Sequence, residues 1–285
     1  MISPYVRRLR LADEVRTLRT KAGLTQAQVA AKSGLSRVVL SQLENGHGVD
    51  QADIIAILDA LGVDGPYWTK VMTIAREAAE RGWWESNKAM GERQALFANL
   101  EAGAATIREF QMIFIPGLLQ TPEFTAARIQ ADGLADRPGY KAGKAVEARQ
   151  IRQRMLRRPD GPGYEVIIDE IAVRRRCVPA DIMRRQLHHL TAVVHDNPNI
   201  TVRVLPLEAE IPGYRVPRSA FGIYTFPDPE DPTVVTVDTV TDDLVLTQPA
   251  QVERYRQLYD LLREAAMPPA DSLAFLREAA EEPTG

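Results

Sequence analysis

Hydrophobic residues recur at helical spacing along the first 81 positions of the chain, and glycines separate the runs. Three runs predict amphipathic helices over residues 11–22, 50–61 and 66–81. Gly23, Gly62 and Gly82 follow these runs, and glycine commonly ends a helix because it adopts positive φ without strain. The first two helices should pack in one bundle, and residues 65–82 should form a helical bridge to whatever follows.

Residues 23–46 predict two short helices separated by a tight turn. Thr25 and Gln28 can form a capping box at the start of the first helix. Gly34 suits the turn, and Ser36 can cap the second helix. The apolar side of the second helix holds Leu35, Leu40 and Leu43. Two helices joined in this way can place the second one in the major groove of DNA, although a helical hairpin that binds a protein is the alternative.

This block resembles the Xre-type, lambda-repressor-like DNA-binding domains over about residues 8–62. The resemblance implies that the outward positions of the second helix read bases, and that Gln26 contacts the backbone and nearby bases. Val38 has no hydrogen-bonding group, so it could only contact a thymine methyl group. The predicted DNA-binding residues are Gln26, Ser36, Arg37, Val38, Ser41, Gln42, Asn45, Lys32 and Arg19.

The charge distribution favours the same ligand. The whole chain carries a net charge of −3, but residues 1–48 hold eight Lys or Arg against three acidic residues. Phosphate contacts supply most non-specific affinity for DNA, so a locally basic region is sufficient. The single cysteine, Cys177, fits a reducing compartment, and no run is apolar enough for a signal peptide or a membrane span. We expect a cytoplasmic protein without membrane contact.

Beyond the bridge, the pattern changes to a mixture of helices and strands. β-Branched runs predict five strands, at residues 164–168, 200–205, 221–226, 233–237 and 244–246. Residues 107–115 fit a helix and a strand equally well. A helix over 179–195 between the first two strands predicts a parallel crossover, and helices over 249–266 and 272–281 close the chain. The expected fold is α+β, with an all-α helix-turn-helix bundle (residues 1–64), the bridge (65–82) and a mixed α/β regulatory domain (83–285).

The second half also resembles a known domain. The residues that carry the likeness are the segment 115–121 (IPGLLQT), Asp169-Glu170 followed by Arg174-Arg175, and Val204-Leu205-Pro206. They resemble the uncharacterised regulatory domain that follows an Xre-type domain in many actinobacterial regulators, and Trp83-Trp84 fits its usual bridge. The resemblance implies an antitoxin-like transcriptional regulator, often paired with a small protein from a neighbouring gene.

We therefore expect a homodimer on a palindromic operator, whose C-terminal domain mediates dimerisation and binds a small acidic partner protein or an effector. The basic stretch over residues 141–158 could be a cradle for that partner, a second DNA surface or a solvated face. The residues predicted to contact the partner are Trp83, Trp84, Arg149, Arg152 and Arg154. A repressor that senses a small molecule is the alternative.

A DNA-associated enzyme is the remaining class. Asp169 and Glu170 follow a predicted strand, and three further aspartates near strand ends could join them in a carboxylate site: Asp238, Asp242 and Asp243. The chain has no nuclease-like Glu-x-Lys pattern, no phosphate-binding glycine loop, and no ligand at metal-site spacing from His188-His189. We expect no catalysis, no cofactor and no metal.

Overall fold

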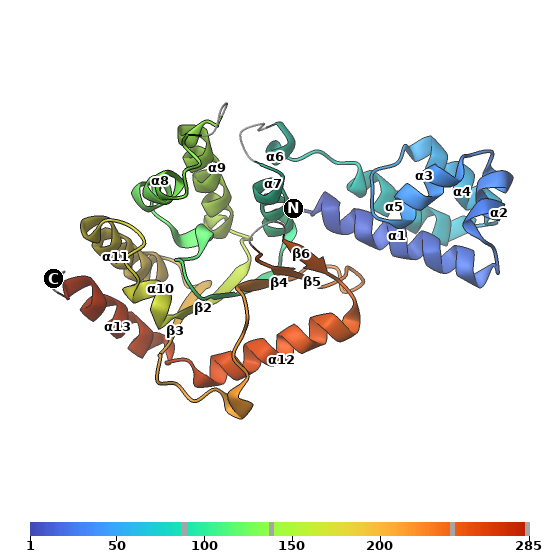
Figure 1. The fold of residues 1–285 in the computed structure, drawn as a ribbon. Coiled ribbons are helices and arrows are strands. Elements are labelled where there is room, and N and C mark those ends of the chain that lie inside the picture. The colour runs from blue at the N-terminus through green and yellow to red at the C-terminus, as the bar shows by residue number, and fades with distance from the viewer. Residues whose placement is uncertain (87–90, 137–139, 240–242, 283–285) are drawn as a thin grey trace. The chain divides into compact units, whose positions relative to one another are not determined.

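The structure is a computed structural model that describes residues 1–86, 91–136, 140–239 and 243–282 (Figure 1). Its contacts divide the chain into two compact units. The first comprises Met1–Ser86, Ala95–Gly103 and Phe226–Pro232, and the second comprises Asn87–Gln94, Ala104–Thr225 and Thr233–Gly285. The fold is α+β, as expected, with helices in the N-terminal region and a mixed sheet with helices after it.

Five helices form the N-terminal bundle of the first unit: α1 (Pro4–Lys21), α2 (Gln26–Ser33), α3 (Arg37–Glu44), α4 (Gln51–Ala60) and α5 (Gly65–Ala78). Val15, Leu40 and Ile57 are fully buried at its centre. Val71 and Ile74 of α5 belong to the same core. Residues 65–78 are therefore the fifth helix of the bundle and not a separate bridge, because their apolar face packs into the bundle core.

The local signals at the helix-turn-helix are confirmed. The Thr25 side chain accepts from the Gln28 backbone N–H, and the Gln28 side chain in turn accepts from the Thr25 backbone N–H. Gly34 ends α2 with φ 72°, in the left-handed region, and Ser36 caps α3 by accepting from the Val39 N–H. These contacts satisfy amide groups that helix ends leave without partners, so they determine where both helices begin.

Two distant segments complete the first unit. The helix α7 (Glu92–Gly103) lies beside the start of α1, where the Ser3 hydroxyl lies 2.7 Å from the Asn99 Oδ1. A Cβ on Gly103 would come within 2.4 Å of the Ser3 nitrogen, so this close approach needs glycine. The short helix α6 (Trp83–Ser86) precedes α7, and the segment Phe226–Pro232 is the loop between two strands of the sheet.

The second unit is built on a six-stranded sheet of order β3-β2-β1-β4-β5-β6. Its strands are β1 (Thr106–Gln111), β2 (Gly163–Asp169), β3 (Ile200–Leu205), β4 (Phe221–Thr225), β5 (Val234–Val237) and β6 (Leu244–Leu246). β1, β2 and β3 are parallel, while β4 pairs antiparallel with β1 and β5. The five predicted strands are confirmed, and the ambiguous segment around residue 107 is a sixth strand because it pairs on both sides.

Helices cover both faces of the sheet, with α12 along one face and α8 and α9 on the opposite side (Figure 1). They are α8 (Pro122–Ala131), α9 (Ala142–Arg154), α10 (Glu170–Arg174), α11 (Ala180–Asp196), α12 (Pro249–Ala265) and α13 (Pro269–Glu281), with short 3₁₀ turns at Gly117–Leu119, Met155–Arg157 and Pro212–Tyr214. Tyr259 of α12 packs against Phe221 in a core with Phe110. Within the described ranges, every helix is too short or too polar to span a lipid bilayer.

Candidate DNA interface

The side of α3 that faces solvent is mostly polar. Arg37, Gln42 and Asn45 are exposed, and Ser41 is half-buried between them. Val38 is 64% exposed, which is unusual for a valine in a helix with a well-packed opposite face. Leu40 and Leu43 hold that opposite face in the core. Six of the predicted DNA-binding residues therefore lie on or next to one side of α3: Ser36, Arg37, Val38, Ser41, Gln42 and Asn45.

Three exposed basic side chains of the bundle are free to meet phosphates. Lys21 ends α1, Lys32 lies in the last turn of α2, and Arg37 is the first residue of α3. No ion pair engages any of them within the residues that the structure describes. Lys32 is thus exposed and without an ion pair among the described residues, as a phosphate contact requires.

Glu44, which sequence reasoning did not single out, organises the interior of the bundle. It is 3% exposed, and its carboxylate accepts from Arg19 Nε at 2.5 Å, from Arg19 Nη2 at 3.0 Å and from Gln26 Nε2 at 2.9 Å. Burial raises the pKa of Glu44, but the Arg19 and Gln26 hydrogen bonds outweigh it and lower the pKa overall. One carboxylate therefore joins α1, the start of α2 and the end of α3.

This arrangement changes the roles of two predicted DNA contacts. Arg19 forms a two-pronged ion pair with Glu44 and also donates to the Leu24 carbonyl at 3.0 Å. Gln26 donates to the same carboxylate. Both side chains hold the two helices of the motif in position, and any contact of theirs with DNA would be added to that role.

A second cluster binds the N-terminal half of α1 to the β4–β5 loop. Arg7 Nη1 lies 3.0 Å from both Asp228 Oδ2 and Asp231 Oδ1, and Arg10 Nη1 lies 2.5 Å from Asp228 Oδ2. Arg10 also pairs with Glu230, which Lys70 contacts at 2.8 Å. We call Arg7, Arg10, Asp228, Glu230 and Asp231 the α1–loop cluster.

The centre of the α1–loop cluster is buried, since the Arg10 and Asp231 side chains are each 5% exposed, while the Glu230 side chain at its edge is 56% exposed. Burial raises the pKa of Asp228, but the Glu230 backbone N–H and the Arg10 and Arg7 guanidinium groups outweigh it and hold the pKa at about 2. Arg7 and Arg10 were counted in the basic excess of residues 1–48. Their charge is neutralised within the protein, so the DNA footprint is narrower than that count predicts.

The residues predicted to contact a partner protein differ in accessibility. Trp84 is only 5% exposed, and Trp83 packs edge-to-face on it with ring centroids 6.0 Å apart. Arg152 is buried and donates to Gln94, and the half-buried Arg149 donates to Gln120. The side chains of Trp84 and Arg152 are packed inside the fold, so neither offers much surface to a partner. Arg154 is exposed, as a partner contact requires.

The carboxylates of the enzyme alternative have structural partners. Asp169 caps α10 by accepting from the Ile171 N–H at 2.9 Å, and burial raises its pKa. Glu170 pairs with Arg174 and accepts from the Leu207 N–H at 2.9 Å. Asp238 and Asp243 both lie beside Arg93.

Asp242, the remaining member of that set, lies outside the described residues. Within the described ranges, no three His, Cys, Asp or Glu side chains are grouped so that they could hold a metal ion. The side chain of His188 in α11 lies 3.3 Å from that of Glu281 in α13, so the two residues form a surface contact between these helices.

Comparison with known families assigns both parts of the chain. Residues 15–68 match the family described as Helix-turn-helix, and residues 94–278 match the family described as Domain of unknown function (DUF5753). The first match covers α2, α3 and α4 and parts of α1 and α5, and the second covers the whole sheet. A search of the curated proteins and one of the solved structures found no match to the chain.

Proposed function

The chain belongs to the family that the domain of unknown function DUF5753 defines, with a helix-turn-helix ahead of that domain, and we propose that it reads a specific operator through α3. The helix-turn-helix makes it a DNA-binding transcriptional regulator. The observation that supports sequence-specific reading is the exposed side of α3, where Arg37, Val38 and Gln42 stand in the first turns of a helix capped by Ser36. The first turns of a recognition helix are the part that reaches base edges.

The side chains on this surface suit different tasks. Arg37 can donate two hydrogen bonds to the O6 and N7 atoms of a guanine, and Gln42 can pair with an adenine edge. Val38 can pack on a thymine methyl group, because its side chain is exposed. Lys32, at the end of α2, is placed to bind a phosphate and carries no sequence information.

The protein acts as a homodimer on a palindromic operator in this proposal. A single helix-turn-helix buries too little DNA surface for tight specific binding, and two recognition helices roughly 34 Å apart can read two half-sites. Sedimentation at micromolar concentration, with and without operator, tests this. Twice the mass of the chain is expected, and a monomer under both conditions would exclude the dimer.

The second unit regulates DNA binding by engaging a small acidic partner protein or an effector, in an antitoxin-like arrangement. Arg154 supports the partner, because it is the exposed member of the predicted set on α9. Charge reversal by Arg154→Glu is therefore expected to weaken partner capture while leaving duplex affinity unchanged. The native host supplies the partner for a pull-down. An equal yield with both proteins would remove Arg154 from the partner surface.

Selection from random duplexes tests the proposed reading of DNA. The purified full chain is expected to enrich a motif with two related half-sites. A pool that stays random after several rounds, from protein that still shifts DNA at low salt, would leave only non-specific binding.

The substitution Lys32→Ala distinguishes a phosphate contact, which positions the protein on DNA, from a contact that reads a base. Removing one phosphate contact should weaken binding to the selected duplex and to random duplexes by the same factor, and should lower the slope of log affinity against log salt by about 0.9. Fluorescence anisotropy at several salt concentrations measures both. Lys144→Ala removes an exposed lysine of α9 and is the matched control, expected to change neither quantity. A sequence-dependent loss for Lys32→Ala would contradict the assignment.

A further inference from the structure

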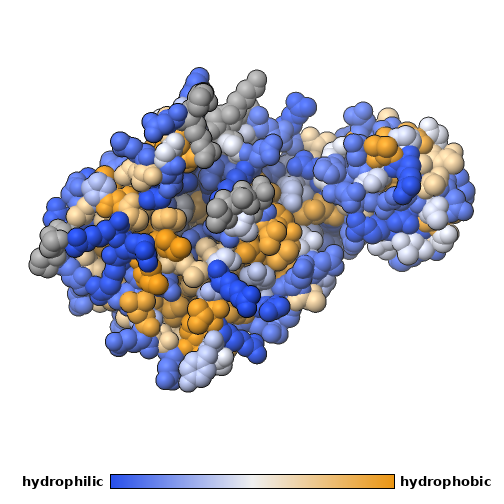
Figure 2. Space-filling model, in the orientation of Figure 1, coloured by the Kyte–Doolittle hydropathy of each residue, from blue (hydrophilic) through white to orange (hydrophobic). Residues whose placement is uncertain are grey.

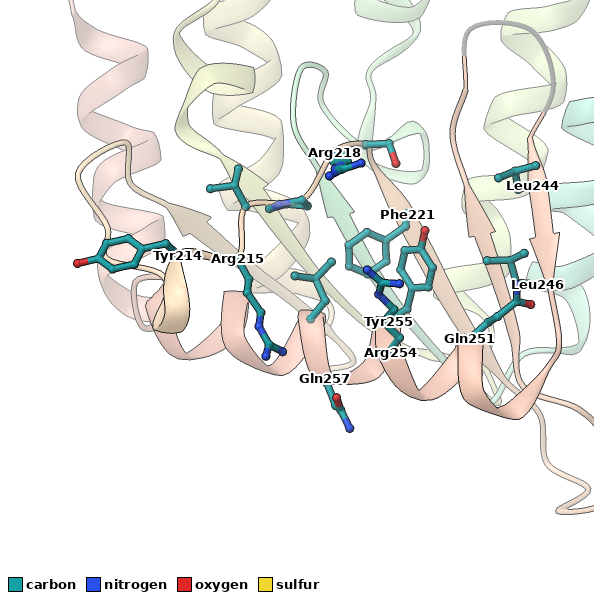
Figure 3. Close-up of a pocket in the computed structure, with 14 residues that line it drawn as sticks. Tyr214, Arg215, Arg218, Phe221, Leu244, Leu246, Gln251, Arg254, Tyr255 and Gln257 are labelled. Carbon is teal, nitrogen blue, oxygen red and sulfur yellow. The ribbon is translucent and has the colours of Figure 1, made fainter.

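The second unit carries a groove that the DNA-reading function does not use. It lies between the segment before β4, residues 214–219, and α12, with β6 along one side, and its volume is about 890 Å³. In Figure 3 the rings of Phe221 and Tyr255 stand at its centre, with Leu244 and Leu246 on one side and Tyr214 and Arg215 on the other. Figure 2 shows hydrophobic and strongly hydrophilic residues adjoining one another on this unit.

The charge of the groove has one sign. Arg215, Arg218 and Arg254 line it, and no aspartate or glutamate is among the described residues of its lining. All three arginines are exposed, and no ion pair engages any of them within the described residues. Elsewhere in this unit arginines do find carboxylates: Glu165, for example, lies about 3 Å from both Arg203 and Arg263. Three unpaired guanidinium groups around one hollow favour an anionic ligand.

The floor of the groove is apolar. Phe221 is 1% exposed and packs on Tyr255 with ring centroids 5.1 Å apart. Leu244, at the side, is 52% exposed and offers apolar surface to a ligand. A site with an aromatic floor and a few charged groups at its edge is typical of small-molecule sites, whose volumes run from about 300 to 1,000 Å³.

The rim contains the only described residue other than glycine with positive φ. Tyr214 has φ 54° and is 84% exposed. A bulky residue in this conformation is strained, and no burial of its ring offsets the strain. Strain of this kind gathers at ligand sites, and here it places an aromatic ring at the mouth of an arginine-lined groove.

We propose that this groove binds a small organic anion whose body is aromatic or aliphatic and whose carboxylate, phosphate or sulfonate pairs with one or more of the three arginines. The apolar body would lie on Tyr255 and Leu244, which are supported by the buried Phe221, and the anionic group would lie toward Arg215, Arg218 or Arg254. Binding of this anion does not depend on the proposed function. Only the role of the anion as the effector that regulates DNA binding rests on it.

The probe is 8-anilinonaphthalene-1-sulfonate, an aromatic anion that fluoresces when bound. The full chain is titrated alongside a variant with Arg215→Gln, Arg218→Gln and Arg254→Gln. The control variant carries Lys141→Gln, Lys144→Gln and Arg157→Gln, which remove three exposed basic residues of the same unit outside the groove. Circular dichroism confirms that both variants are folded, and the neutral dye Nile red reports the apolar floor.

Saturable binding of the sulfonate by the full chain is expected to weaken about tenfold or more in the groove variant, because charge-assisted hydrogen bonds are lost, and to persist in the control. Nile red should bind the three proteins alike. Equal sulfonate affinity in both variants would overturn the proposal. The proposal would also be overturned if hexaglutamate, but not the sulfonate, binds at these arginines. The occupant of the groove would then be an acidic segment of a protein. Selection from random duplexes is independent of this titration, so failure of the proposed function would be distinguishable.

Discussion

Glu44→Ala is expected to lower the free energy of unfolding of the first unit by about 3 kcal/mol or more. The substitution leaves the Arg19 guanidinium, only 18% exposed, without its carboxylate, and removing one member of a buried ion pair is strongly destabilising. Gln26 loses its acceptor at the same time. Because these contacts join α1, α2 and α3, affinity for the selected duplex should fall as well.

Urea denaturation followed by circular dichroism measures the stability change, and fluorescence anisotropy measures duplex affinity. Glu80→Ala is the matched control, because Glu80 is an exposed glutamate of the same unit. Its effect should stay within about 0.5 kcal/mol, as for most surface substitutions. If the Glu44 and Glu80 variants unfold at the same urea concentration, the buried carboxylate does not join the three helices.

The second large effect concerns the α1–loop cluster. Arg10→Met should destabilise the first unit by about 2–4 kcal/mol, because the buried Asp231 and the partly buried Asp228 then share Arg7 alone. The pKa of Asp228, held at about 2, should move toward its ordinary value of 3.8. A carboxyl whose pKa is lowered by folding stabilises the folded protein at pH values above its ordinary pKa, and this stabilisation is lost as the pH falls through about 2. Because the substitution raises the pKa of Asp228, the variant should lack this stabilisation at neutral pH.

Carbon-detected NMR titration of the aspartate carboxyls measures the pKa, and urea denaturation at pH 7 measures stability. The double variant Arg10→Met with Asp228→Asn is expected to recover part of the loss, since it removes the uncompensated charge together with its partner. An Arg10→Met protein in which Asp228 still titrates at about 2 would show that Arg10 does not hold that carboxylate.

Local signals in the sequence predict the helix-turn-helix well. The Thr25 capping box, Gly34 and Ser36 each act within a few residues of their own position, so their outcome depends little on the rest of the fold. β1 could not be assigned in the same way, because Ile107 and Phe110 are buried three positions apart, a spacing that also suits a helix. Its pairing with β2 and β4 decides the matter, and those partners are far along the chain.

Long-range charge pairing explains the larger differences. Arg10 and Asp228 are 218 positions apart, so a count of charges in the N-terminal segment assigns Arg10 to DNA when it in fact meets a carboxylate. Arg152 was similarly counted in a basic face, yet it bonds Gln94 of a helix 58 positions earlier. Patterns along the chain indicate which residues are charged, but they do not indicate which charges are already neutralised.

Selection from random duplexes with Arg37→Ala, run in parallel with the unsubstituted chain, tests most directly whether α3 reads the operator. If it does, the variant should enrich the same motif with the preference lost at one position of each half-site, and should bind the original motif about 1–3 kcal/mol more weakly. An unchanged motif enriched equally well by the Arg37→Ala protein would show that the exposed side of α3 does not read the operator.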